Sequence, residues 1–468
     1  MSPGGSSSSL GRAPKQVYGG ACVIVYHGLT SLTQEPDLGE RQPQLAASGS
    51  DDLIDPVYAP FFQAMASSRH ITVAPDIGNA LLECFFCYSA SSYCIVAKST
   101  FLRDMALGGP SFSELLLMSI YAVATRMIDG LGDSERQAQG DLFISLAREM
   151  LSKELQGASK ITTVQALLLM SGRESAVGNA TQGWTLAGIA FRLVQDVSVW
   201  QSGALLDACT SADCLSSEYT CLGRMSRDQQ ACPPKRRAYE TVFSGRHSRG
   251  TTVGREPTFP PRKGQDPSRV PDFDMDTQPW VPYFANPGLR PESLVGYTYQ
   301  PRNVVAAFRQ LASLDLIIHD LIVELYGPDS SLDGSCRVAF VARTRVRLED
   351  YWAEFPGSMK STIDPAPPPM LYHAAWILLY RPQLGDRDIQ GVTGAGHICL
   401  THSASAHELG STYHRTFRGK MSYLPMYCAF VSATFDILLL KADDMRTRSD
   451  SLSRLESWLE ILSAVRTS

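Results

Sequence analysis

Residues Ile161 to Trp200 contain two adjacent apolar segments that constrain the fold of the whole chain. Apolar residues of the first segment recur at helical spacing and define one face: Val164, Leu167, Leu168 and Met170. The next run, SGRESAVGNAT, is rich in Gly, Ser and Asn, which are typical of a chain reversal. The stretch therefore predicts a helical hairpin.

The second helix of this hairpin, which follows from Thr181, is apolar on most of its surface. Its apolar residues form two adjoining stripes: Trp184, Ala187, Phe191 and Val194, and then Leu186, Ala190, Leu193 and Val197. A narrow polar strip remains, made by Thr185, Arg192 and Asp196. Because apolar surface on so many sides needs covering, we expect other helices to surround this one.

Helical spacing continues along most of the chain, and no segment with strand periodicity competes with it. Further helices are predicted at Ser111–Met127, Leu142–Leu155, Pro301–Leu325, Val338–Phe355, Leu371–Tyr380, Ile398–Leu409, Pro425–Lys441 and Ser453–Val465. With 468 residues, 44% of them hydrophobic and 19% charged, the chain is able to bury a large core. The fold class is therefore predicted to be all-α, a large multi-helix bundle.

Composition divides the chain into four predicted regions. Residues 1–55 are rich in Gly, Ser, Gln and Pro and are expected to be disordered. Residues 56–200 form a first helical half, 201–300 a basic, Gly- and Pro-rich linker, and 301–468 a second helical half. The long apolar stripe after Pro301 favours a bundle helix over a dimer seam.

Several motifs resemble the fungal-specific transcription factor domain, a large helical regulatory region. The signature follows TVQALLLM and consists of Trp184, Gly188, Ala190, Arg192 and Asp196. Lys98–Met127 is similar to the opening helices of that family, and Pro369–Leu384 to a late helix that ends in Tyr380, Arg381 and Pro382. Together the matches cover roughly residues 80–440.

The resemblance implies a nuclear transcription regulator without catalytic activity, one that controls a metabolic or secondary-metabolite gene set. It also implies coregulator proteins as partners, a homo- or heterodimer, and a small-molecule effector. The alternative is a helical ligand-binding or scaffold protein derived from the same domain. Residues 235–257 depart from the family pattern, through either local degeneration of the domain or a misassigned exon boundary.

The family usually carries a zinc cluster with two Cys-x2-Cys-x6-Cys halves, and the cysteines here give one such spacing. Cys84, Cys87 and Cys94 match it, but FF and YSASSY between them contain no Lys or Arg. We therefore reject them as a metal site and interpret the segment as a buried helix. No cofactor is expected in this chain, and zinc only with a further upstream cluster. DNA is then expected to be bound weakly or through a partner.

A basic stretch lies in the predicted linker. Residues 224–269 contain eleven Lys and Arg and four Asp and Glu, although the formal net charge of the chain is -5. Such a run is typical of a solvated linker. The sharper hypothesis is that Lys235, Arg236 and Arg237 form a nuclear import signal or contact phosphate.

Sequence motifs of catalysis, metal binding and membrane insertion are not found. The chain has no Gly-x-Ser-x-Gly elbow, no phosphate-binding loop and no apolar run long enough for a membrane span. His397, His402, His407 and His414 lie close in sequence, but the gaps between them differ from the i, i+4 spacing of helical zinc ligands. We interpret them as histidines on helix surfaces and loops.

Overall fold

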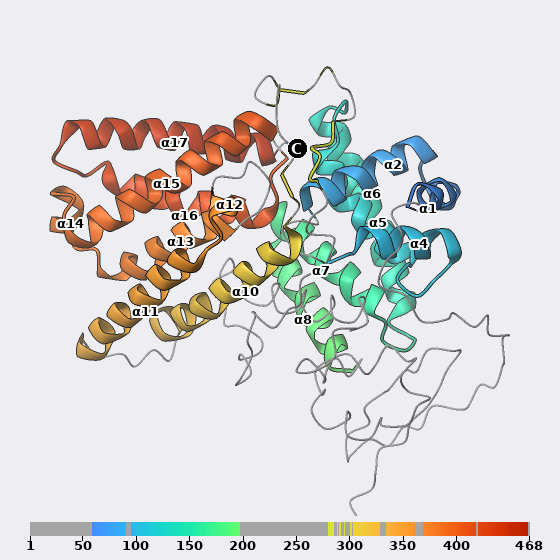
Figure 1. The fold of residues 1–468 in the computed structure, drawn as a ribbon, viewed down its shortest axis with the longest axis horizontal. Helices are drawn as coiled ribbons and strands as arrows, with labels where there is room; N and C mark the ends of the chain where they lie inside the picture. Colours follow the sequence, from blue (N-terminus) through green and yellow to red (C-terminus); the bar gives the residue numbers. More distant parts are fainter. Residues whose placement is uncertain are drawn as a thin grey trace, which may run out of the picture.

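The computed structural model describes residues 59–89, 95–196, 279–284, 288, 290–291, 294, 300–301, 303–327, 334–360, 368–417 and 420–466. In these ranges all the secondary-structure elements are helices. The one β-type pairing is an isolated bridge between Pro279 and Pro301. The predicted all-α class is confirmed. Figure 1 shows the helices in two groups, residues 59–196 on one side and 304–466 on the other.

The first group begins with short helices and ends with the predicted hairpin. Its members are α1 (Ala59–Ala66), α2 (Pro75–Cys84), α4 (Lys98–Leu107), α5 (Glu114–Ala124), α6 (Asp133–Glu154), α7 (Ile161–Ala176) and α8 (Ala180–Asp196). Pro75 occupies the first turn of α2, and the Ser113 side chain caps α5 by accepting from the Leu116 N–H at 3.1 Å. Gly108 adopts φ +75° just after α4, the left-handed geometry of a helix end.

The second group contains the longest of the described helices, α15 (Gly394–Phe417). Its members are α10 (Val304–Leu321), α11 (Gly334–Glu354), α12 (Gly357–Lys360), α13 (Pro368–Tyr380), α14 (Asp386–Gln390), α15 (Gly394–Phe417), α16 (Tyr423–Leu439) and α17 (Met445–Arg466). Every residue of α13 is buried, since α10, α11, α15 and α16 all contact it. The predicted helices of this region are all present, several of them longer than expected.

The α7–α8 hairpin is confirmed, with a shorter turn than the sequence indicates. α7 continues through Ala176, so the reversal is confined to Val177–Asn179, where Gly178 has φ +94°. The two helices come close together at Gly183. A Cβ there would lie 2.9 Å from the Ser171 carbonyl oxygen, and the Ser171 hydroxyl donates to the Gly183 carbonyl. Glycine is therefore required for this contact.

Two hydrophobic clusters fill the interior. The first core cluster belongs to the helices of residues 59–196 and the second to those of residues 304–466, but three residues from outside the first group also lie in the first cluster: Trp280, Leu294 and Phe417. The predicted boundaries at 200 and 300 remain predictions. The regions 1–55 and most of 201–300 lie outside the described residues.

Candidate functional site

The two core clusters meet at a junction built around a π-helical turn, Phe85–Ser89, which follows α2. Such turns carry one more residue per turn than an α-helix and are frequent at functional sites. Here the turn directs Tyr88 toward the second group, where its ring lies 5.8 Å from that of Phe417 at the end of α15. Trp280 packs edge-on against Phe417 at 5.5 Å and donates from Nε1 to the Cys87 carbonyl oxygen at 3.2 Å.

A nearly buried ion pair joins the two groups at this junction. Lys420 Nζ lies 2.6 Å from Asp129 Oδ2, and the two side chains are 7% and 18% exposed. The ammonium also lies over the rings of Tyr88 and Phe284, at 5.1 and 4.6 Å from their centroids. The Tyr413 hydroxyl donates to the Lys420 carbonyl oxygen at 2.7 Å, which fixes the backbone. Burial raises the pKa of Tyr88 well above its ordinary value, so its ring stays neutral beside this pair.

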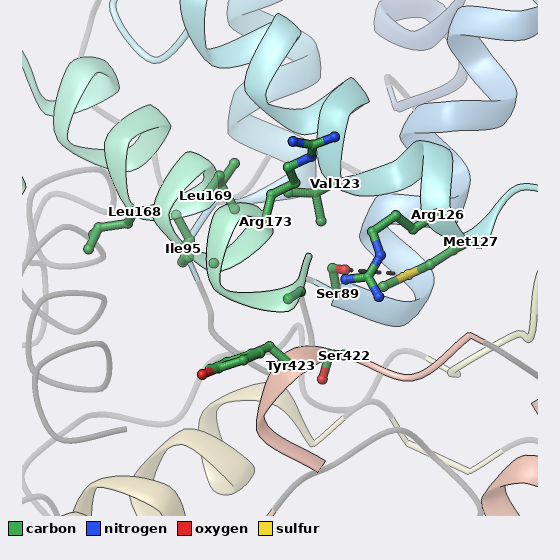
Figure 2. Close-up of a pocket in the computed structure, with 12 residues that line it drawn as sticks. Ser89, Ile95, Val123, Arg126, Met127, Leu168, Leu169, Arg173, Ser422 and Tyr423 are labelled. Atoms are coloured by element: carbon green, nitrogen blue, oxygen red, sulfur yellow. Dashed lines mark hydrogen bonds between the residues drawn. The ribbon is translucent and has the colours of Figure 1, made fainter. Parts of the chain in front are cut away.

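A pocket adjoins the ion pair and is lined by both groups (Figure 2). The first group contributes several residues of α7, Ser89 of the π-helical turn, Ile95, Val123 of α5, and Arg126 and Met127 of the 3-10 turn that follows α5. From the second come Ser422 and Tyr423, at the start of α16. The empty space between its lining side chains amounts to about 470 Å³ when the open solvent at its mouth is included. Ser422 of the pocket is two residues from Lys420, and Met127 of the pocket is two residues from Asp129. The pocket and the ion pair are therefore held by the same two backbone segments.

The chemistry of the pocket is mainly apolar. Aliphatic and thioether side chains make most of the wall: Ile95, Val123, Met127, Leu168, Leu169 and Ala176. Two arginines also line it, and none of the lining residues is acidic. Arg173 is committed elsewhere, since its guanidinium contacts Glu174 at 2.9 Å and also Asp141. The guanidinium of the other arginine, Arg126, lies near Ser89 and Met127 in Figure 2.

A second polar feature lies inside the second group. His373 Nδ1 and His402 Nδ1 are 2.9 Å apart, so that one ring donates and the other accepts. His402 also stacks on Trp376, with ring centroids 4.6 Å apart. Burial lowers the pKa of His373 to about 3, helped by the neighbouring His402, and burial lowers the pKa of His402 to about 4. Both rings are therefore neutral near neutral pH.

The four histidines close in sequence do not converge. All of them belong to α15, but His402 pairs with His373 of α13, while His407 accepts or donates at the Ser411 hydroxyl at 3.1 Å. In the part of the chain that the structure describes, no three His, Cys, Asp or Glu side chains gather as a metal site would require. The same residues contain no helix with the length and apolar composition of a membrane span.

Comparison with known proteins identifies a family that part of this chain resembles. Residues 82–205 match the profile of the fungal specific transcription factor domain. These residues are therefore similar to that domain. The matched residues include the π-helical turn, α5 and α7, and thus most of the pocket wall.

Curated relatives of the domain are transcriptional regulators of fungi. The nitrogen assimilation transcription factor nit-4 of Neurospora crassa is 26% identical over 428 residues, which cover 85% of this chain and 35% of that protein. The nitrogen assimilation transcription factor nirA of Emericella nidulans is 24% identical over 477 residues, 95% of this chain and 48% of that protein. An uncharacterized transcriptional regulatory protein of Schizosaccharomyces pombe is 28% identical over 185 residues, 39% of this chain and 28% of that protein.

The chain thus spans about a third to a half of the length of the first two relatives. No solved structure matches it significantly.

The five residues that the sequence analysis predicts as a family signature all lie on α8. Ala190 is fully buried and Trp184 half-buried, whereas Arg192 is exposed. A Cβ at Gly188 would meet nothing within 4 Å, so close packing does not explain this glycine. Asp196 is the last residue of the helix. Some residues of the predicted signature therefore pack in the core, and others lie on the protein surface.

The predicted late motif, Tyr380, Arg381 and Pro382, lies at the end of α13 and in the turn that follows it. Tyr380 is buried and stacks parallel to Trp376 at 6.0 Å. Arg381 donates from Nη1 to the Thr434 hydroxyl of α16 at 3.2 Å, and the exposed Pro382 lies in the short 3-10 turn that follows. Arg381 thus connects the end of α13 to α16, and all three residues lie outside the pocket.

The structure describes only some of the cysteines and none of the three basic residues that the sequence analysis singled out. Cys84 is buried at the end of α2, as the predicted helix requires, and Cys87 lies in the π-helical turn next to the Val281 carbonyl oxygen. Burial raises the pKa of the Cys84 thiol to about 12, which opposes the thiolate that zinc needs. Cys94, Lys235, Arg236 and Arg237 lie outside the described residues.

Sequence reasoning missed the residues that join the two groups. Lys420 and Asp129 are 291 positions apart, and neither belongs to a motif. The predicted signature contains Gly188 and not Gly183, although Gly183 makes the close helix contact. A small residue among bulky ones on an apolar face was the available signal for Gly183. For the ion pair no local signal exists.

Proposed function

We propose that this chain is a transcription regulator that acts in the nucleus and has no catalytic activity of its own. The single observation that supports this most is the match of residues 82–205 to the fungal specific transcription factor domain. The relatives over most of this chain are named as transcription factors. The junction between the helical groups is the part of the domain that receives regulatory input and passes it on by changing how the groups contact each other.

The regulated genes are proposed to be metabolic genes. The names of two relatives refer to nitrogen assimilation, and a secondary-metabolite gene set is the other member of this class. Coregulator proteins, and a second copy or a related chain, are the proposed protein partners. DNA is proposed to be bound weakly by this chain or through such a partner, because the sequence contains one Cys-x2-Cys-x6-Cys spacing and not the pair that a binuclear cluster uses.

A promoter-fusion experiment tests the regulatory role. The full chain is attached to an unrelated DNA-binding module in a fungal host, and transcription of a reporter with the cognate sites is measured. We expect reporter output to differ from that of the module alone and to depend on residues 80–440. Equal output from the fusion and from the module, at equal protein levels, would contradict the proposal and favour a scaffold or ligand-binding protein.

Nuclear import is assigned to the basic run. Replacing Lys235, Arg236 and Arg237 by Ala in a fluorescently tagged chain is expected to move signal from nucleus to cytoplasm, because import receptors recognise such clusters. The matched control replaces Arg446 and Arg448, two arginines on the surface of α17, by Ala. An unchanged nuclear signal in the first variant removes these three residues as the import signal.

A further inference from the structure

The helix α17 has a line of apolar side chains that the described part of the chain leaves exposed. Met445, Leu452 and Leu459 are seven residues apart, so they lie one above the other along the helix. Their exposed fractions are 71%, 50% and 64%. The inner side of α17 packs against α15 and α16 with buried side chains, among them Trp458. The helix is therefore apolar on an exposed side as well, which is typical of an interaction surface.

The position of α17 makes this line accessible. Figure 1 shows α17 along an edge of the second group, with α15 and α16 next to it. Arg454 on its inner side contacts Asp436 of α16 at 2.7 Å, which holds the helix in this position. The end of α16 adds two exposed apolar side chains, Ile437 and Leu440, a few residues before Met445. Apolar surface therefore continues beside the start of the line.

Charged residues of opposite sign flank the two ends of the line. Arg446 follows Met445, and Glu460 follows Leu459, and both are exposed. They are fourteen positions apart, about four helical turns, so they flank the line on the same side. Arg446 lies 4.0 Å from Asp450, but both of these side chains are largely exposed, and such a surface pair contributes little. Glu460 has no ion-pair partner among the described residues.

This arrangement is complementary to itself when two copies of α17 pack antiparallel. A two-fold axis at Leu452 places Met445 of one copy against Leu459 of the other and brings the two Leu452 side chains together. The same axis places Arg446 of each copy opposite Glu460 of the other. Parallel packing would instead gather like charges at each end, which is unfavourable. We propose that α17 is the surface through which this chain forms an antiparallel dimer with a second copy of itself.

The expected dimer is reversible. α17 has 22 residues and is about 33 Å long, so one of its faces is smaller than the roughly 800 Å² per partner of a standard stable interface. We therefore expect a dissociation constant in the range of ~1–100 µM. A second copy is one of the partners in the proposed function, so the regulatory meaning of the dimer rests on that function. Dimer formation itself does not.

Sedimentation velocity of the full chain, measured from about 1 to about 200 µM, tests the dimer. The wild type is expected to shift reversibly from monomer to dimer over this range. Leu452→Glu places two carboxylates at the axis and is expected to raise the dissociation constant at least about tenfold. The matched control is Leu142→Glu on α6, a leucine with 54% exposure, which should leave the dissociation constant unchanged. Circular dichroism shows whether each variant is folded.

Two results overturn this assignment. One is a wild type that stays monomeric up to the highest concentration, in which case the exposed line serves another protein or another part of the chain. The other is a dimer that Leu452→Glu weakens no more than Leu142→Glu does, because the interface then lies elsewhere.

Charge reversal tests the antiparallel arrangement at low ionic strength, where screening is weakest. Glu460→Arg places an arginine opposite Arg446 at both ends of the interface and is expected to raise the dissociation constant about tenfold. Arg446→Glu is expected to have a similar effect. The double variant Arg446→Glu/Glu460→Arg exchanges the two charges and is expected to restore the wild-type dissociation constant to within about threefold. A double variant as weak as the single variants would overturn the antiparallel arrangement.

The reporter fusion separates this proposal from the proposed function. Sedimentation uses no promoter, so a dimer with a silent reporter contradicts the regulatory role alone. Reporter output from a chain that stays monomeric contradicts the assignment of α17 alone.

Discussion

Lys420 and Asp129 form the charged contact with the lowest exposure between the two helical groups, among the ion pairs that the described residues show. Both side chains lie among rings, where water screens charge poorly. A buried pair of this kind contributes little compared with a well-packed apolar pair, but each partner requires the other. The stability of the junction therefore depends on keeping both residues or on replacing both.

Replacing Lys420 by Met removes the cation that neutralises Asp129. We expect a loss of about 3–5 kcal/mol of unfolding free energy, measured by urea denaturation, because an uncompensated charge then remains in the junction. The double variant Lys420→Met/Asp129→Leu is expected to regain most of this loss. The control is Lys153→Met, which removes an exposed partner of Glu149 and should cost at most about 0.5 kcal/mol. A similar small cost for Lys420→Met would show that the pair contributes nothing particular.

The His373–His402 pair predicts a pH dependence of stability. The pKa values of both rings lie well below the ordinary value of 6.5, so the unfolded chain binds more protons than the folded chain between these limits. The stabilising contribution is complete above the unfolded pKa and is lost as the pH falls through 6.5 toward 4.

Urea midpoints measured at about pH 7 and about pH 5 test this dependence. The wild type is expected to lose more stability over this interval than the double variant His373→Phe/His402→Phe, which has no titrating ring there. Replacing the exposed His397 by Gln is the control and should leave the pH dependence as in the wild type. Identical slopes in the wild type and the double variant would show that the pair does not titrate as its burial requires.

At the scale of elements, α7 and α8 form the most extensive helix contact of the first group. Their contact depends on Gly183, where any side chain meets the backbone of Ser171, while Gly188 one turn and a half later has open space around it. Two glycines of one helix thus have opposite roles. Gly183 permits packing, and Gly188 costs helix stability without a packing benefit.

Gly183→Ala and Gly188→Ala are matched tests of this difference. The first is expected to destabilise the chain by about 1–3 kcal/mol, because the added methyl overpacks the helix contact. The second is expected to stabilise it by up to about 1 kcal/mol through helix propensity. Thermal and urea unfolding measure both changes. Loss of stability in both variants would show that Gly188 also makes a contact, and loss in neither would contradict the close approach at Gly183.

Element boundaries show where sequence reasoning succeeds. Apolar periodicity predicted α7, α8, α10 and α13, since burial alone fixes which face of a helix is apolar. It ended α7 early, because Ser171 and Gly172 look like turn residues, whereas tertiary packing buries Ser171 within the helix. The π-helical turn Phe85–Ser89 was not predicted either, since its extra residue leaves no trace in composition.

At the scale of the whole molecule, the sequence predicted the class and the family but not the junction. The all-α class follows from periodicity along the chain, and the motifs around Trp184 and Tyr380 led to the domain. The pocket needs Ser89, Arg126 and Tyr423 at one place, and their spacing in sequence does not indicate that. Only the three-dimensional path of the chain brings them together.

The first core cluster includes Trp280 and Phe417, which come far later in the chain than its helices. During synthesis from the N-terminus, the ribosome has released α1 to α8 long before it reaches these two side chains. Part of the apolar surface of the early helices therefore stays exposed until these residues are synthesised. Chains with exposed apolar surface are prone to aggregate. A nascent chain of this protein is thus expected to depend on chaperones until residue 417 has emerged, and truncation before that point is expected to leave the N-terminal helices insoluble.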